Sequence, residues 1–404
     1  MSLSKQTPIY SFTVAFFLYA TMLVDLYRKM IGVNTTMVRN IVYIISLGLI
    51  LWDMQKKKKV VPMMLMGVVM TVLFFFSSLI NAGYDQVYFT AWTLFVFRLW
   101  PAYYIGRYTY DWAAVSVVVR KFLWIAVIYA VIAYLSPYDN SGETNAYATI
   151  STNLFFVVII ACYDSFTNRK RWAELICILC FIPILFLGTR ACLFGAVFAL
   201  MLIFGRKISQ SSGQKKIRYY SLLFIGGVAV IILFTAMTDV LLDLLPNSRT
   251  LQYFVKGEMF DDSSRSESFY SRLVVSLQEN PLKMHGFLGD QIFLAGQNAS
   301  INEILASYSH NVYLELCMNF GVIIGIVLSI TFTIVLLKAY RKSRYADYDI
   351  EYVYLGVLGM TFVNMLVSFS WLHAYEVWFL FGLSYCLIRR EVTDLVPDDD
   401  MSED

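Results

Sequence analysis

The sequence predicts an all-α, polytopic integral membrane protein with about 12 transmembrane helices and one large outer loop. Of the 404 residues, 58% are hydrophobic and 15% are charged, which is too little charge to cover the surface of a soluble domain. Apolar windows of roughly 16 to 25 residues recur along the chain, each near the length that a helix needs to cross a bilayer. The basic residues collect on alternate connections, as the positive-inside rule requires.

Twelve apolar windows define the predicted spans. They cover residues 8–26, 38–54, 60–81, 87–106, 119–136, 147–163, 172–188, 191–205, 219–237, 312–337, 352–371 and 375–388. The first window lacks a small-residue cleavage site and ends in Asp25-Leu26-Tyr27-Arg28-Lys29, so we interpret it as a retained span and not as a signal peptide.

The basic residues orient the chain. Most of the 32 lysines and arginines fall on one set of connections, which places both termini in the cytoplasm. Arg28, Lys29 and Arg39 are exceptions on a short outer connection. The predicted organisation is nine helices in residues 1–237, an outer loop at 238–311, three helices in 312–390, and an acidic cytoplasmic tail at 391–404 that we expect to be solvated and disordered.

The composition also excludes several functions. Nothing in the charge pattern indicates nucleic-acid binding. All six cysteines fall in apolar runs, so Cys177-x-x-Cys180 is expected to pack between helices and not to bind metal. On the outer side no Asp/His cluster has metal-ligand spacing, so neither a metal nor another cofactor is predicted.

The outer loop at 238–311 is long for a connection in a compact protein, which is typical of a functional segment. Ser264-Arg265-Ser266-Glu267 has the form of a capping box and predicts a helix that runs to about Glu279, where Asn280-Pro281 ends it. Arg265 and Arg272 are seven residues apart and therefore lie on the same edge of this helix, beside an apolar stripe.

A third arginine, Arg190, lies in a tight outer bend, Gly188-Thr189-Arg190-Ala191. Planar guanidinium groups bind phosphate oxygens well, so three arginines on one membrane face indicate an anionic, lipid-linked substrate. The alternative is that Arg190 reaches lipid headgroups and that Arg265 and Arg272 only border a surface helix.

His310 ends the loop, where the apolar run 312–337 begins. A helix start disfavours a nearby positive charge, so this imidazole is expected to stay neutral and able to accept a proton as a general base. The alternative is an interfacial histidine that only hydrogen-bonds a carbonyl. Asn311, Glu315 and Asn319 follow at intervals of four and form a polar stripe. Three roles are open for Glu315: it faces a cavity, it pairs with a loop arginine, or it makes a structural hydrogen bond.

Three further residues remain open. Arg98 lies well inside the window 87–106 and either extends toward the cytoplasmic end or has a function. His373 and Glu376 lie in the last outer connection, beside the same face of the membrane, but their spacing alone does not assign them to the site.

These features resemble the O-antigen polymerase and ligase superfamily of bacterial membrane glycosyltransferases, over residues 187–337. The matching positions are the bend at Arg190, Arg265 with Phe269, Asn280-Pro281-Leu282, Gly286 with Gly289, His310-Asn311, Leu314, and Gly321 with Gly325. Gly286-Phe287-Leu288-Gly289 departs from the more frequent Gly-x-Gly, and Phe269 stands where Trp is frequent.

The resemblance implies a GT-C-like fold in the bacterial cytoplasmic membrane and a polysaccharide polymerase. The implied substrate is an undecaprenyl-pyrophosphate-linked oligosaccharide that is transferred at the outer face onto a sugar hydroxyl. His310 would be the catalytic base, and Arg190, Arg265 and Arg272 would bind the pyrophosphate, supported by Asn311 and Glu315. The implied partners are membrane lipid, a chain-length regulator and a flippase. No metal would be needed.

Two alternatives remain. An O-antigen ligase would use the same chemistry with a lipid or protein acceptor. A flippase for lipid-linked oligosaccharides would also need many spans and cations, but it should hold the cations in a central cavity within the spans and would have little use for a long outer loop.

Overall fold

The computed structural model describes residues 8–31, 36–135, 151–161, 179–180, 184, 190–211, 213–214, 216–217, 220–221, 243, 266–296 and 298–389. Every regular element in these residues is helical, which agrees with the all-α prediction. The tail 391–404 and most of the predicted spans 172–188 and 219–237 lie outside the described residues.

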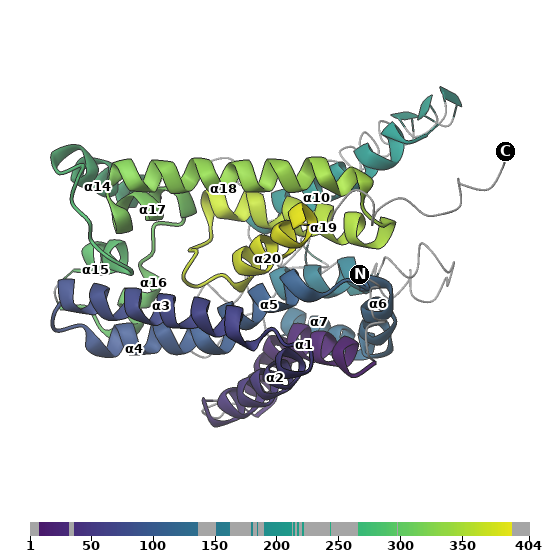
Figure 1. Ribbon diagram of the computed structural model, residues 1–404, viewed down its shortest axis with the longest axis horizontal. Helices are drawn as coiled ribbons and strands as arrows, with labels where there is room; N and C mark the ends of the chain where they lie inside the picture. Colours follow the sequence, from purple (N-terminus) through teal and green to yellow (C-terminus); the bar gives the residue numbers. More distant parts are fainter. Residues whose placement is uncertain are drawn as a thin grey trace.

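Figure 1 shows the arrangement of the helices, coloured along the chain from purple to yellow. The first part comprises α1 (Pro8–Ile31), α2 (Thr36–Lys56), α3 (Val60–Ile80), α4 (Asp85–Leu94), η1 (Phe95–Leu99), α5 (Trp100–Tyr108), α6 (Trp112–Lys121), α7 (Leu123–Leu135) and α10 (Arg190–Ser209). The second part comprises α14 (Ser266–Glu279), α15 (Gly289–Ala295), α16 (Ile301–Ala306), α17 (Val312–Phe320), α18 (Val322–Lys342), η2 (Ser343–Tyr345), α19 (Tyr348–Val367) and α20 (Tyr375–Arg389).

Six of the described helices are long and apolar enough to cross a membrane, namely α1, α2, α3, α10, α18 and α19. A seventh span results if α6 and α7, which meet at a bend of 58°, count as one. The chain is therefore a helical membrane protein.

The predicted span 87–106 is an almost unbroken helical segment of α4, η1 and α5. Its middle, η1, is a π-helical turn that contains Arg98. A π turn fits an extra residue into a helix and so changes the direction in which the side chains around it point, and such turns are frequent at functional sites.

The predicted span 312–337 is not one helix, and this expectation was wrong. The short α17 ends at Phe320, Gly321 follows with φ 79°, and α18 then starts a new helix. A Cβ on Gly325 would lie 2.4 Å from the Cα of Cys317, so α18 folds back tightly against α17. Hydropathy could not reveal this break, because glycine and its neighbours leave the run apolar while the positive φ turns the backbone.

The described part of the loop 238–311 forms α14, α15 and α16. As predicted, α14 ends at Glu279. Together with α17, these helices gather at one end of the molecule, beside the end of α3 and the start of α18 (Figure 1). This end holds the residues of the candidate site.

Candidate functional site

A glycine-containing turn at residues 285–289 joins the loop to the membrane helices. Tyr88 of α4 donates to the carbonyl of Phe287 at 2.6 Å, and Asn81 donates to the carbonyl of His285 at 2.7 Å. From the other side, the backbone N–H of Gly286 donates to the carbonyl of Asn319 at 3.0 Å. The turn is thus fixed between the α3–α4 hairpin and α17.

Phe287 anchors this turn by packing. Its ring is fully buried and contacts the rings of Phe74, Phe320 and Trp371 edge-on, at centroid distances of 5.1, 5.7 and 5.1 Å. Edge-to-face contacts of this kind are each worth about 0.5–1.5 kcal/mol beyond burial. The phenylalanine that departs from the Gly-x-Gly pattern therefore has a structural role here.

Two buried carboxyl groups lie next to this turn. Asp290 of α15 and Glu315 of α17 are both inaccessible to solvent. When the Asn319 amide is oriented to satisfy its neighbours, its nitrogen donates to Asp290 Oδ1 at 3.2 Å and its oxygen accepts from the Trp371 indole at 3.2 Å. Asp290 Oδ2 has no hydrogen-bond partner. Burial raises the pKa of Asp290 to about 7, against smaller opposite effects from backbone N–H groups of Ser309 and Gln291.

Glu315 connects α17 to the turn between α19 and α20. Its carboxylate accepts from the Ser370 hydroxyl at 2.7 Å and from the backbone N–H of Trp371 at 3.0 Å. The sequence left three roles open for Glu315, and these bonds correspond to the structural hydrogen bond. They fix the turn that carries His373.

His373 lies against Gln291 of α15, whose side-chain amide nitrogen and oxygen are 2.8 and 3.1 Å from Nε2. Burial, with a further contribution from the positive charge of Arg98, lowers the pKa of His373 to about 4. The imidazole is therefore neutral at physiological pH, which is the form that accepts a proton.

His310 occupies a strained backbone conformation with φ 54°. Left-handed conformations are uncommon outside glycine and cluster at functional sites. The His310 ring packs on the Tyr308 ring with centroids 4.2 Å apart, and the same tyrosine ring lies 6.0 Å from the ring of His373. Two imidazoles from distant parts of the chain thus flank one tyrosine. The next residue, Asn311, caps α17 by accepting from the backbone N–H groups of Tyr313 and Leu314.

Arg98 points toward this region from inside the helix bundle. Its guanidinium carbon is 4.6 Å from the centre of the Tyr375 ring, and its charge interacts with Glu376, Asp25 and His373. Arg98 Nε is buried without a hydrogen-bond partner. A donor of this kind is unusual within a membrane protein and marks a candidate ligand contact.

The three arginines predicted from the sequence are placed differently. Arg272 is exposed on α14, and its guanidinium donates to the carbonyls of Phe293 and Leu294 at 3.4 and 3.3 Å, at the end of α15. Arg190 is the first residue of α10, and its side chain lies outside the described residues, as does all of Arg265. The structure therefore brings His310 and Glu315 into one region and assigns Arg272 contacts within the loop.

Sequence reasoning missed Asp290, Gln291 and Tyr308. The available signal was weak, since Asp290 and Gln291 simply follow Gly289 in the loop 238–311. Chemically, the described region offers the imidazole of His310 as a candidate proton acceptor, the neutral imidazole of His373 beside it, and a nearby partly buried cation able to stabilise negative charge.

Among the described residues, no three His, Cys, Asp or Glu side chains are arranged so that they could hold a metal ion. Comparison of the chain with protein-family models, curated proteins and solved structures finds no match. The superfamily resemblance consequently rests on the sequence motifs alone.

Proposed function

We propose that this protein is a polysaccharide polymerase that transfers a polyprenyl-pyrophosphate-linked oligosaccharide onto the hydroxyl of an acceptor sugar. The proposal includes the twelve-span, GT-C-like architecture in a bacterial cytoplasmic membrane, with both termini inside and the loop 238–311 outside. Three observations support the proposal: the membrane character of the chain, the motif resemblance and the chemistry of the candidate site.

In the proposed reaction, the acceptor hydroxyl oxygen attacks the anomeric carbon of the donor sugar. The bond from that carbon to the pyrophosphate oxygen breaks, and the pyrophosphate leaves with the electron pair. His310 takes the hydroxyl proton. Positive charge near the departing phosphate lowers the barrier because negative charge develops there in the transition state.

The observation that carries the proposal is the meeting of His310 and His373 on the Tyr308 ring, near Arg98. A neutral imidazole suits the base. Arg98 is a further cation for the pyrophosphate beside the proposed Arg190 and Arg265. Arg272 donates to carbonyls at the end of α15, and we propose that it supports the loop and does not itself contact the pyrophosphate.

The test is the glycan profile of a deletion strain that carries the wild-type protein or a His310→Ala variant, with membrane levels of the protein matched. We expect a loss of long polymer and an accumulation of single lipid-linked repeat units. An accumulation of long lipid-linked polymer without attached glycan would instead identify a ligase.

One observation favours the flippase as the second candidate. Arg98 is a cation within the spans, in the position that transport of a phosphate-linked lipid would require. A flippase predicts that the deletion strain traps single repeat units at the inner face, whereas a polymerase leaves them at the outer face. Lectin accessibility of the repeat unit in intact spheroplasts separates the two.

A further inference from the structure

A second group of cations lies where α5 and α20 end, away from the candidate site. The two helices touch through their backbones, since a Cβ on Gly106 would lie 2.3 Å from the carbonyl oxygen of Phe379, and one on Gly382 would lie 2.3 Å from that of Tyr103. The end of α20 also meets the end of α18, where Lys342 donates to the carbonyl of Ile388 at 2.7 Å. This close crossing fixes which side chains meet one turn farther along.

Those side chains are arginines stacked on tyrosines. The guanidinium carbons of Arg107 and Arg389 lie 4.3 and 4.9 Å from the centre of the same ring, that of Tyr385. Arg107 also lies 5.1 Å from the centre of the Tyr108 ring, and Lys59, at the start of α3, is 5.9 Å from that ring. Three cations from three parts of the chain thus gather around two tyrosines.

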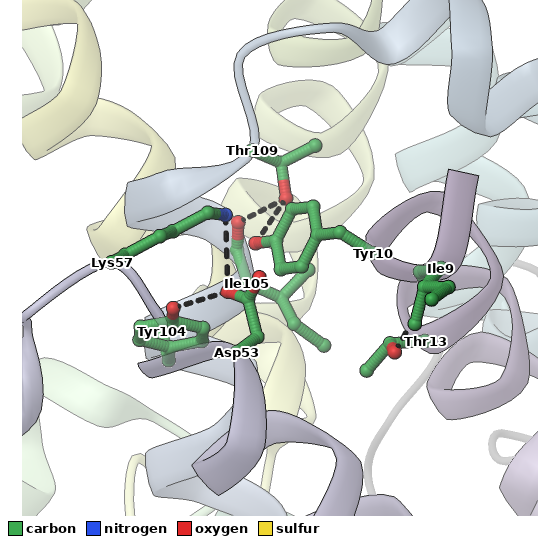
Figure 2. A network of polar contacts seen from close by, with 8 residues as sticks. All are labelled: Ile9, Tyr10, Thr13, Asp53, Lys57, Tyr104, Ile105 and Thr109. Atoms are coloured by element: carbon green, nitrogen blue, oxygen red, sulfur yellow. Dashed lines mark hydrogen bonds and ion pairs between the residues drawn. The ribbon is translucent and has the colours of Figure 1, made fainter. Parts of the chain in front are cut away.

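Two other cations, Lys57 and Arg206, have acidic partners, whereas none is found for these three among the described residues. Lys57 lies 3.0 Å from Asp53 Oδ2, in a network that also includes Tyr104 (Figure 2), and Arg206 pairs with Glu351. In the part of the chain that the structure describes, no Asp or Glu forms an ion pair with Lys59, Arg107 or Arg389. Cation–ring contacts position like charges close together without neutralising them, so an anion would relieve their repulsion.

The surroundings favour a lipid as the source of that anion. Directly after Lys59, α3 presents exposed apolar side chains, with Val61 78% and Leu65 64% accessible. An acyl chain could lie along this surface while its phosphate reaches the cations. Tyrosine and arginine are side chains that suit the headgroup level of a bilayer.

We propose that Lys59, Arg107 and Arg389 form a binding site for the phosphate headgroup of an anionic phospholipid, in the leaflet at this end of α5. Arg107 is held in place by its own bond to the Tyr103 hydroxyl, at 3.1 Å. The site is independent of the glycan chemistry proposed above, and it would anchor the α5–α20 pair to the membrane surface.

The test is lipid binding to the purified full-length protein. Wild type, the double variant Arg107→Gln/Arg389→Gln, and Arg341→Gln are compared. Arg341 is an exposed arginine near the end of α18 and serves as the matched control. Each protein is delipidated in neutral detergent and incubated with equal amounts of phosphatidylglycerol and phosphatidylcholine, and the bound molecules of each lipid are counted by native mass spectrometry.

We expect wild type and Arg341→Gln to retain phosphatidylglycerol over phosphatidylcholine. Each lost charge should weaken retention roughly fivefold, so the double variant should lose the preference. Equal retention by all three proteins would overturn the proposal. If the double variant does not elute as a folded protein, Lys59→Gln replaces it. We then expect a smaller loss of phosphatidylglycerol retention, and retention equal to that of wild type would overturn the proposal.

A thermal-unfolding arm separates a lipid from a free anion. Phosphatidylglycerol in mixed micelles should raise the melting temperature of wild type, whereas inorganic phosphate at the same concentration should not. An equal rise with inorganic phosphate would overturn the assignment to a lipid headgroup.

Discussion

The imidazole of His373 is neutral because its surroundings disfavour a second positive charge. Burial and Arg98 lower its pKa to about 4, from the ordinary value of about 6.5. A depressed pKa contributes stability that is fully present above the ordinary value and is lost as the pH falls through the folded-state value. His373 therefore makes the protein less stable in mild acid.

We predict that His373→Gln flattens this acid response. Between pH 6.5 and 4, the melting temperature of the purified wild-type protein should fall more steeply than that of the variant, because glutamine does not titrate. Differential scanning fluorimetry across this range measures both curves. Parallel curves would show that His373 is not held neutral by burial.

The effect of Asp290 on the pH dependence of stability has the opposite sign to that of His373. The pKa of Asp290 is raised from 3.8 to about 7, so its contribution to stability is fully present below about 3.8 and is lost as the pH rises through about 7. We predict that Asp290→Asn gains in melting temperature relative to wild type between pH 5 and pH 8. The exposed Asp85→Asn is the control, and a constant offset for Asp290→Asn across this range would contradict the assignment.

At the scale of elements, the hairpin of α17 and α18 turns at Gly321 and packs closely at Gly325. A methyl group at Gly325 would meet the backbone of Cys317 at 2.4 Å, and backbone cannot move aside as a flexible side chain can. We predict that Gly325→Ala destabilises the protein by about 1–3 kcal/mol and disturbs Glu315, which is on the same hairpin.

The matched control is Gly205→Ala in α10, where nothing lies within 4 Å of the added methyl group. Alanine in a helix interior is more favourable than glycine by roughly 0.5–1 kcal/mol, so this variant should be neutral or slightly stabilised. Thermal unfolding and size-exclusion profiles of the two variants provide the comparison. Equal behaviour of both would mean that α17 and α18 are not in backbone contact.

The same elements show what a sequence can reveal. Windows at 8–26, 38–54 and 60–81 predicted α1, α2 and α3. In a membrane protein, a continuous apolar run with charged ends forms a spanning helix, because the backbone polar groups must be paired within the segment. The helix α14 was predictable from Asn280-Pro281. The break at Gly321 and the π turn at Arg98 were not, because both depend on backbone geometry that leaves hydropathy unchanged.

At the scale of the whole molecule, the candidate site forms from segments that are far apart in the sequence. His310 was identified from its position before an apolar run, but its neighbour His373 is brought to it by Glu315, Ser370 and Gln291. No spacing rule links these positions. The network on Asp290 likewise depends on the tertiary fold, so a single sequence could only suggest His373 as one of several candidates.

The proposed topology makes its own prediction. A cysteine introduced in place of the exposed Lys283 should react with a membrane-impermeant maleimide in intact spheroplasts. One in place of the exposed Arg341 should react only after permeabilisation. Labelling of Arg341→Cys in intact cells would reverse the orientation and move the candidate site to the cytoplasmic face.

The glycan ladder of a complemented deletion strain shows whether the region around His310 and His373 polymerises a lipid-linked glycan. We expect His310→Ala to reduce a full ladder to single repeat units and His373→Ala to shorten it strongly. Lys283→Ala, an exposed change in the same loop, should leave the ladder intact. A normal ladder in His310→Ala, at normal protein level, would rule out His310 as the catalytic base.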